Sequence, residues 1–219
     1  MREEKMFLEC IDLRKKLSHF SIDLSFALEE NHMAALVGPS GSGKSTVLSM
    51  IAGLVRPDKD SGTKIILDGK DITNLEPGKR GCGMVFQNPS LFLNMSVVDN
   101  VAYGLVCRGV KKKDARVKAE LFLEKFRMQG FSKRSPETLS GGEAQRVALA
   151  RTLIVQPKLV LFDEPLSALD TELRKKLAEE IRTMQKTIPF TAIMVTHDLD
   201  EAASISDEII HIEAGKIKN

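Results

Sequence analysis

The sequence carries its clearest chemical motif at residues 38–46, which read Gly38-Pro39-Ser40-Gly41-Ser42-Gly43-Lys44-Ser45-Thr46. This run matches the pattern G-x-x-x-x-G-K-[ST] and lies between an apolar stretch and a segment with helical spacing. Glycines allow successive backbone N–H groups to curve around phosphate groups, and the N-terminus of the following helix adds partial positive charge. We expect Lys44 to reach the β- and γ-phosphates of a nucleotide and the Ser45 hydroxyl to ligate Mg²⁺. A Gly/Ser-rich connecting turn is the alternative interpretation.

Two adjacent carboxylates, Asp163 and Glu164, end an apolar run at residues 159–162. In P-loop enzymes an aspartate at this place holds Mg²⁺. Successive side chains of a strand point to opposite sides, so Glu164 is expected to face the γ-phosphate, where a carboxylate can polarise a water molecule. Charges at the rim of an ordinary strand end are the alternative. With a phosphate loop upstream, the second acid predicts hydrolysis as well as binding.

A second candidate anion site lies at residues 139–146, which read Leu139-Ser140-Gly141-Gly142-Glu143-Ala144-Gln145-Arg146. The segment leads into a run with helical spacing, so Ser140 and the amides of Gly141 and Gly142 would stand at a helix N-terminus, where an anion is stabilised. A serine N-cap followed by two glycines would explain the same residues without any ligand.

These motifs require elements that bring them together. Apolar alternation predicts strands at 7–11, 20–26, 33–37 and 65–70. The middle of the chain predicts helices, one beginning after Ser96 and one over Lys113–Met128. The final third alternates, which predicts a parallel sheet with helical crossovers. Its expected elements are strands at 159–163, 191–195 and 208–212 and helices at 171–186 and 198–204.

With its motifs in this order, the sequence resembles the ATP-binding cassette (ABC) ATPases, whose signature reads LSGGQ-x-x-R. The resemblance covers essentially the whole chain. Glu143 stands where the family more often has Gln, which leaves the phosphate-facing Ser140 and the two glycines intact. The motifs that carry the resemblance are, in family order, the phosphate loop at 38–46, Gln87 in Val85-Phe86-Gln87, the signature at 139–143, Asp163-Glu164, Ser167-Ala168-Leu169-Asp170, and His197 in Val195-Thr196-His197-Asp198.

The resemblance implies a fold of the α/β class. It would consist of a P-loop NTPase (RecA-like) core with a largely parallel sheet, an N-terminal antiparallel β subdomain and an inserted helical subdomain. One domain would cover residues 1–219, with the helical subdomain at approximately 88–157 and antiparallel strands drawn from 1–37 and 60–75.

The resemblance also implies ATP and Mg²⁺ as ligands, and a dimer in which each site joins the phosphate loop of one subunit to the signature of the other. Gln87 would sense Mg²⁺ and the attacking water, and His197 would hydrogen-bond the γ-phosphate. Asp170 would connect the two sites. Neither Tyr nor Trp stands where many members stack the adenine, so Phe20 is the candidate for that contact.

The stretch at 86–105 is similar to the importer version of the family, in which this region receives a transmembrane permease. Phe92, Leu93 and Met95 would suit a hydrophobic docking groove, or they would fill the core of the helical subdomain. The segment at 17–26 resembles the N-terminus of molybdate/tungstate importer ATPases. We therefore expect a homodimer, or a pseudo-dimer with a related cassette, on the cytoplasmic face of the cell membrane, with permease subunits and an extracytoplasmic substrate-binding protein as partners.

Composition is consistent with this interpretation and excludes several others. The chain of 219 residues has 42% hydrophobic residues and nearly balanced charge, 32 Lys+Arg against 30 Asp+Glu, which argues against a disordered chain and against nucleic acid as a partner. No apolar run approaches the ~20 residues of a membrane span. The start shows no signal peptide. Many importer ATPases carry a regulatory domain after the last strand, and we expect this chain, which stops at Asn219, to lack that control.

Three other classes of protein are alternatives to an importer ATPase. An exporter-type or lipoprotein-release ABC ATPase would share every motif. A P-loop kinase or GTPase would share the first motif, but no Asn-Lys-x-Asp is present and the signature would be unexplained. A soluble ABC protein of DNA repair or translation would need a coiled-coil insertion or a second cassette, and the sequence has neither. The resemblance implies that the permease and the binding protein choose the transported substrate.

Overall fold

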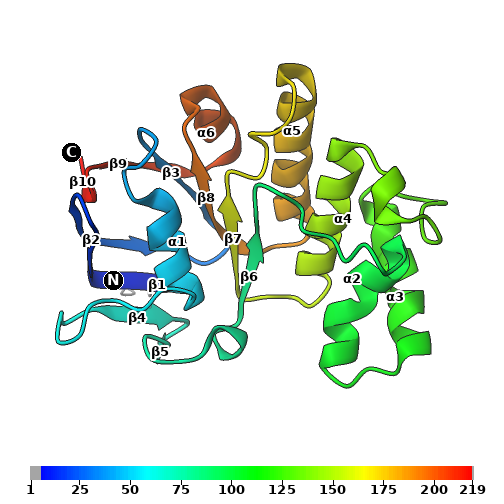
Figure 1. The fold of residues 1–219 in the computed structure, drawn as a ribbon, viewed down its shortest axis with the longest axis horizontal. Helices are drawn as coiled ribbons and strands as arrows, with labels where there is room; N and C mark the ends of the chain where they lie inside the picture. The colour runs from blue at the N-terminus through cyan, green and yellow to red at the C-terminus, as the bar shows by residue number, and fades with distance from the viewer. Residues whose placement is uncertain (1–5, 219) are drawn as a thin grey trace, which may run out of the picture.

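The computed structural model describes residues 6–218, so residues 1–5, where no signal peptide is expected, and Asn219 lie outside the described part. Within this described part, two sheets and six α-helices form an α/β fold (Figure 1). The helices are α1 (Lys44–Ala52), α2 (Val97–Cys107), α3 (Lys112–Lys125), α4 (Gly141–Leu153), α5 (Thr171–Thr187) and α6 (Leu199–Ile205). None of the described helices has the length and apolar character needed to cross a membrane.

The larger sheet has six strands in the order β10-β9-β3-β8-β7-β6. Its strands are β3 (Met33–Val37), β6 (Cys82–Val85), β7 (Leu159–Asp163), β8 (Thr191–Thr196), β9 (Glu208–Glu213) and β10 (Lys216–Ile217). All neighbours except β9 and β10 pair in parallel. Because parallel strands run the same way, the carboxyl ends of β3, β8, β7 and β6 meet at one edge of the sheet, where such folds bind ligands.

Helices cover both faces of this sheet, which explains why β3 and β8 are buried along their whole length. Alternate residues of β7 and β8 enter two different apolar clusters, and Ala35 and Val37 of β3 form a third, small cluster with Ala202 of α6. One cluster joins the sheet to α1 and the antiparallel strands, and the other joins it to α2, α3, α4 and α5. Helix α1 therefore lies between the two sheets, directly after the loop at 38–43.

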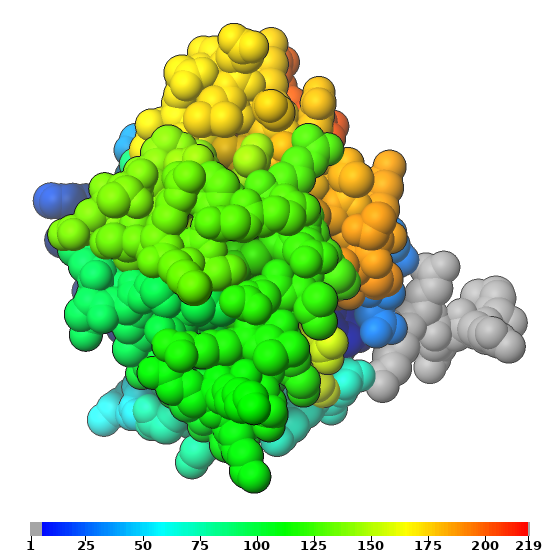
Figure 2. All heavy atoms as spheres, turned by 90° about the vertical axis from the view of Figure 1, so that its right-hand side faces the viewer, coloured from blue at the N-terminus to red at the C-terminus, as the bar shows by residue number. Residues whose placement is uncertain are grey.

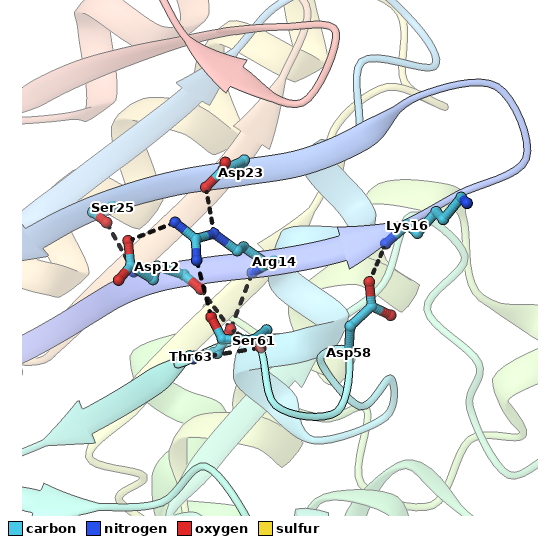
Figure 3. A network of polar contacts seen from close by, with 8 residues as sticks. All are labelled: Asp12, Arg14, Lys16, Asp23, Ser25, Asp58, Ser61 and Thr63. Atoms are coloured by element: carbon cyan, nitrogen blue, oxygen red, sulfur yellow. Dashed lines mark hydrogen bonds and ion pairs between the residues drawn. The ribbon is translucent and has the colours of Figure 1, made fainter.

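The smaller sheet is antiparallel, with the order β2-β1-β4-β5. Its strands are β1 (Leu8–Lys16), β2 (Ser21–Leu28), β4 (Lys64–Leu67) and β5 (Lys70–Asp71). Polar contacts fasten the loop between α1 and β4 to this sheet (Figure 3): the Arg14 guanidinium donates to Asp23 at 3.0 Å and to the Ser61 carbonyl at 3.1 Å, and the Lys16 amide donates to Asp58 at 2.7 Å. The sheet also borders the 38–46 loop, because a Cβ atom added at Gly43 would lie 3.2 Å from the side chains of Phe20 and Ile22.

Helices α2, α3 and α4 follow β6 in the chain, precede β7, and form much of the face in Figure 2. Ser96 caps α2, as the sequence predicts, and Arg116 of α3 donates twice to Asp99 of α2, at 2.8 and 2.7 Å. These contacts tie the first turn of α2 to α3. The division of the chain into subdomains at 88–157, 1–37 and 60–75 stays a prediction.

The expected fold class is confirmed, with differences in the elements. The helix predicted over Lys113–Met128 ends at Lys125, because the chain turns through a positive φ of 55° at Arg127. The first strand continues to Lys16 past a bulge between Cys10 and Leu13. The strand predicted at 65–70 divides at Asp68 and Gly69, whose φ angles of 51° and 70° make a hairpin turn. β6 and β10 were not predicted as strands.

Candidate functional site

The loop at 38–43 closes around the side chain of Lys44. The ammonium group donates to the carbonyl oxygens of Gly38 at 2.8 Å and Pro39 at 2.9 Å, and the residue is only 4% exposed. Burial lowers the pKa of Lys44, while the nearby carboxylates of Glu164 and Asp163 act in the opposite direction. A buried ammonium group next to several backbone amides is suited to an anion with more than one charge.

Two glycines give this loop a shape that other residues do not easily adopt. A Cβ atom at Gly38 would lie 2.0 Å from the carbonyl oxygen of Ile212, so the close approach to β9 requires glycine. Gly43 has a φ of 102° and directly precedes α1. In the described part of the chain, no side chain caps α1 and no acidic residue lies in its first turn. Its positive end is therefore free for a ligand.

The remaining residues of the loop face either solvent or the protein. Ser40 and Gly41 are exposed and Thr46 is half-buried. The Oγ atom of Ser42 is buried and finds no hydrogen-bond partner among the described residues, which is unusual for a polar atom.

A pair of oxygen ligands lies at the start of α1. The Ser45 hydroxyl donates to Asp163 Oδ1 at 2.7 Å, across 118 positions of sequence. A hydroxyl and a carboxylate are the hard oxygen ligands that Mg²⁺ takes. Within residues 6–218, no group of three or more His, Cys, Asp or Glu side chains is placed to hold a metal ion. The pair thus fits Mg²⁺ bound by one carboxylate together with phosphate oxygens, which is its usual mode.

Glu164 and His197 form a second polar pair at the same sheet edge. Glu164 Oε2 lies 3.3 Å from His197 Nδ1, and the two residues follow the adjacent strands β7 and β8. The Glu164 amide donates to the Val195 carbonyl at 3.2 Å, and the residue has a positive φ of 47°. Such a backbone is costly for a glutamate and occurs where the surrounding structure enforces it, often at functional sites.

Gln87 follows β6, which pairs in parallel with β7, so it lies beyond the same edge as Asp163. Its side chain is exposed. The four strand ends β3, β8, β7 and β6 therefore carry the 38–46 loop, His197, Asp163-Glu164 and Gln87 in neighbouring positions.

A cavity of about 210 Å³ borders the loop and includes Phe20. Its lining residues are Leu17, Phe20, Ser40, Gly41, Gly43, Lys44, Ser45, Thr46 and Glu164. Phe20 thus lies where a flat group attached to bound phosphates could contact it. Leu17 was not predicted as a site residue, although it is the apolar residue that follows β1. A larger hollow of about 690 Å³ lies elsewhere, beside Arg80 and residues 56–63.

The predicted second anion site forms the start of α4 but does not border this cavity. Ser140 is the N-cap, and its amide and hydroxyl donate to Glu143 Oε2 at 2.7 and 2.9 Å, while its Oγ also accepts from the Glu143 amide at 3.4 Å. These bonds, first that of the amide, lower the pKa of Glu143. The pattern S-x-x-E predicts such a capping box, and the sequence interpretation missed the part of Glu143 in it.

The start of α4 packs on the segment that follows β7. Added Cβ atoms at Gly141 and Gly142 would lie 3.4 Å from Leu169 Cδ2 and 3.0 Å from Leu173 Cδ2. Asp170, predicted to connect two sites, caps α5 by accepting a hydrogen bond from the Leu173 amide at 2.9 Å. The two helix ends predicted to bind anions are thus separate, because the cavity at α1 includes no residue of α4.

Known proteins share both sequence and fold with this chain. Residues 22–167 match the profile of the family described as ABC transporter. The chain is 48% identical over 208 residues to a protein of Agrobacterium fabrum named "Fe(3+) ions import ATP-binding protein FbpC", covering 94% of this chain and 58% of that protein. It is 41% identical over 216 residues to the protein of the same name from Photorhabdus laumondii, covering 98% and 61%.

This chain thus spans a little under two thirds of the length of these relatives. A solved structure with a TM-score of 0.82 and 27% identity covers 97% of each chain; it is described as the dimeric structure of a post-hydrolysis state of the ATP-binding cassette MJ0796 bound to ADP and Pi.

Proposed function

This chain belongs to the ABC transporter family, and from that membership we propose that it binds and hydrolyses ATP as the nucleotide-binding subunit of an importer. The observation that carries the proposal is the meeting, at one sheet edge, of the 38–46 loop, the Ser45–Asp163 pair and the Glu164–His197 pair. The import names of the relatives support the direction of transport.

ATP would be held mainly by its phosphates. The backbone of Gly38–Thr46, the free N-terminus of α1 and the buried Lys44 supply donors and positive charge for the β- and γ-phosphates. Phe20, in the cavity beside the loop, would contact the adenine. Ser45 and Asp163 would hold Mg²⁺, with Gln87 beside them, and the metal would neutralise charge on the phosphates.

Glu164 would act as the general base for hydrolysis. Its carboxylate would accept the proton of the water that attacks the γ-phosphorus. His197, 3.3 Å away, would hold that carboxylate in place and hydrogen-bond the γ-phosphate. The enforced backbone of Glu164 keeps its side chain at the cavity, which it lines. This role assignment explains why two acids follow β7.

Two copies of the chain, or this chain with a related cassette, would form the complete site. Ser140, Gly141 and Gly142 at the start of α4 would contact the γ-phosphate held by the other subunit, and Asp170 would lie at the shared interface. The separation of α4 from the cavity at α1 supports this division, and so does the dimeric state of the similar cassette.

The partner for transport would be a permease that docks on residues 86–95, within a helical subdomain at about 88–157. Two side chains hold the backbone of this segment by hydrogen bonds. Asn100 of α2 pairs with both backbone groups of Phe92, at 2.8 and 3.0 Å, and Arg151 of α4 donates to the Pro89 and Ser90 carbonyls at 2.9 Å. Phe92 and Leu93 are 37% and 61% exposed. A rigid segment with exposed apolar side chains supports docking over core packing.

A charge at Leu93 tests the docking surface. We expect Leu93→Glu to fold normally and to lose association with membranes of cells that express the whole transport system. Leu121→Glu is the matched control, because Leu121 is 60% exposed on α3 and lies outside the segment. Equal membrane association of the two variants would contradict this docking surface.

The proposed transport system also includes an extracytoplasmic substrate-binding protein. This chain would lie at the cytoplasmic face of the membrane.

Hydrolysis is tested directly at Glu164. Purified wild-type chain should release phosphate from Mg²⁺-ATP, and Glu164→Gln should lower kcat by about 100-fold or more while ATP affinity is retained, as loss of a general base implies. In gel filtration, Glu164→Gln should form a dimer with ATP and not with ADP, and adding Ser140→Arg should abolish that dimer. Unchanged turnover in Glu164→Gln would refute the assigned base.

A further inference from the structure

Arg174, near the start of α5, joins two segments that carry the proposed catalytic side chains. Its Nη2 atom donates to the carbonyl oxygens of Leu169 at 3.0 Å and Ser167 at 3.5 Å, and its Nη1 atom lies 3.7 Å from Asp198 Oδ2. Ser167 and Leu169 belong to the segment that follows Glu164 after β7. Asp198 follows His197 directly after β8.

The segment from Glu164 to Leu169 is held at its beginning by its own turn. The Glu164 carbonyl accepts hydrogen bonds from the Ser167 amide at 3.2 Å and from the Ser167 hydroxyl at 2.9 Å. At the far end of the segment, the Arg174 side chain donates to the carbonyls of Ser167 and Leu169. Loss of this donor would release the far end of the turn at Ser167 and Leu169. The turn could then shift and carry the strained backbone of Glu164 with it.

The segment after β8 is fixed through the same arginine. Asp198 Oδ1 accepts from the amides of Asp200 and Glu201 at 2.9 and 3.1 Å and so caps α6, while Oδ2 faces Arg174. The Asp198 amide donates to Thr196 Oγ1 at 3.1 Å. His197 thus lies between two anchored residues, Thr196 and Asp198, and Arg174 links the second of them to the segment after β7.

One hydrogen-bond donor of the Arg174 side chain is left without a partner. Its Nε atom is buried and has no hydrogen-bond partner within residues 6–218. Buried donors are normally paired, and an unpaired one requires an explanation. Contact with both segments at once provides that explanation, because the guanidinium must span them.

We propose that Arg174 is a positioning residue for ATP hydrolysis: by holding the Ser167 and Leu169 carbonyls together with Asp198, it sets the place of the Glu164 carboxylate relative to the His197 ring. The inference rests on the proposed function, because it assumes that Glu164 and His197 act on ATP. Arg174 itself does not contact the cavity that borders the phosphate loop.

A matched arginine on the same helix separates positioning from stability. Arg182 pairs with Asp207, and the side chains of Arg174 and Arg182 are both 23% exposed. Asp207 accepts from the Met33 amide at 2.9 Å, at the beginning of β3 and therefore at the sheet edge opposite the site. We expect Arg174→Met to lower kcat for ATP about tenfold or more with KM within about twofold, because small displacements of reacting groups are costly. Arg182→Met should lower Tm with kcat within about twofold.

Two conservative variants keep the test decisive if Arg174→Met fails to fold. Asn caps a helix about as well as Asp, so Asp198→Asn removes the charge facing Arg174 and keeps the cap of α6. It should lower kcat by a few fold, and Arg174→Lys, which keeps a charge but loses the forked donor, should lie between wild type and Arg174→Met. Combining Asp198→Asn with Arg174→Lys should lower kcat by less than the product of the single effects, because the two residues act through one contact.

The outcomes distinguish this inference from the proposed function. A wild-type chain that does not hydrolyse ATP would refute the proposed function itself. A wild-type chain that does, with kcat unchanged in the Arg174 variants or lowered equally in Arg182→Met, would show that Arg174 only stabilises the start of α5. A change confined to KM would place its effect on binding and would overturn the inference as well.

Discussion

The N-termini of α1 and α4 have similar sequences and opposite electrostatics. Each has glycine and serine residues at or next to its first turn, and each offers backbone amides to an anion. In the described structure α1 has no side-chain cap and no acid in its first turn, and Lys44 adds a buried positive charge. The start of α4 has a serine cap and the carboxylate of Glu143, which accepts two hydrogen bonds from Ser140.

This difference indicates different ways of binding a phosphate. At α1 the positive end of the helix is unopposed, so an anion gains the full interaction with it. At α4 an incoming phosphate meets a carboxylate that already uses the amide and hydroxyl of Ser140. A phosphate would therefore bind α4 weakly by itself and would need other contacts to supply the rest of the free energy. That behaviour suits a surface that engages and releases during a cycle.

The largest effect should come from removing the charge at α1. Lys44→Ala deletes an ammonium group that would make charge-assisted bonds to two phosphates, each worth about 1.5–3 kcal/mol, so the Kd for ATP should rise by about 100-fold or more. Isothermal titration calorimetry of the isolated chain measures this. Lys111→Ala, at an exposed lysine before α3, is the control and should leave the Kd unchanged. Equal affinities in the two variants would mean that α1 is not the nucleotide site.

An effect of intermediate size is expected from replacing one glycine near the start of each of the two helices. Gly41 has a φ of 78°, so Gly41→Ala should strain the loop by about 1–2 kcal/mol and lower Tm. Gly141 lies in the first turn of α4, where an added Cβ atom would meet only Leu169 Cδ2 at 3.4 Å. Alanine favours helix by up to about 1 kcal/mol over glycine, so Gly141→Ala should keep or raise Tm.

Gly141→Ala should nevertheless weaken the ATP-dependent dimer of Glu164→Gln about tenfold, because the new methyl group occupies the space through which the phosphate of the other subunit approaches. Light scattering over a range of protein concentrations measures the dimer. An unchanged dimer would show that glycine at 141 has no part in the contact, and a lowered Tm would show that the fold itself requires it.

Much of the fold and site could be predicted because the signals are local. The phosphate loop, the acids after β7 and the final alternation of strands and helices each depend on short patterns of apolar and polar residues. The sequence does not predict β6, because its residues Cys82-Gly83-Met84-Val85 include one β-branched residue and a glycine, which is a weak strand pattern. That glycine is explained only by packing, since a Cβ atom there would lie 2.6 Å from Thr152 of α4.

The parts that could not be predicted depend on distant contacts. Arg174 meets Asp198 from another strand end, and no local pattern records that pairing. The exposure of Phe92 depends on how Asn100 and Arg151 hold the preceding segment. Glu143 is the exception, because the spacing of Ser140 and Glu143 is a local signal that the sequence interpretation did not use.

The smallest expected effect, at Glu143, tests the electrostatic difference itself. Glu143→Gln keeps a side chain able to accept from the Ser140 amide and removes the charge. Since the folded state lowers the pKa of Glu143, the carboxylate stabilises the fold above its unfolded pKa, and that contribution is lost as pH falls through the folded pKa. The variant should therefore be slightly less stable than wild type near pH 7, by at most about 1 kcal/mol for an exposed charge at a helix end.

The stability difference should shrink as pH falls below the ordinary glutamate pKa of about 4.3 and through the lower pKa of Glu143 in the folded state, and thermal unfolding at several pH values measures it. At neutral pH the same variant should form the ATP-dependent dimer a few fold more tightly in the Glu164→Gln background, because the phosphate no longer meets a carboxylate at α4. Glu137→Gln, just before the α4 cap, is the control for a general change in charge. A weaker dimer in Glu143→Gln would mean that the carboxylate assists the contact, and the contrast between α1 and α4 would then concern geometry alone.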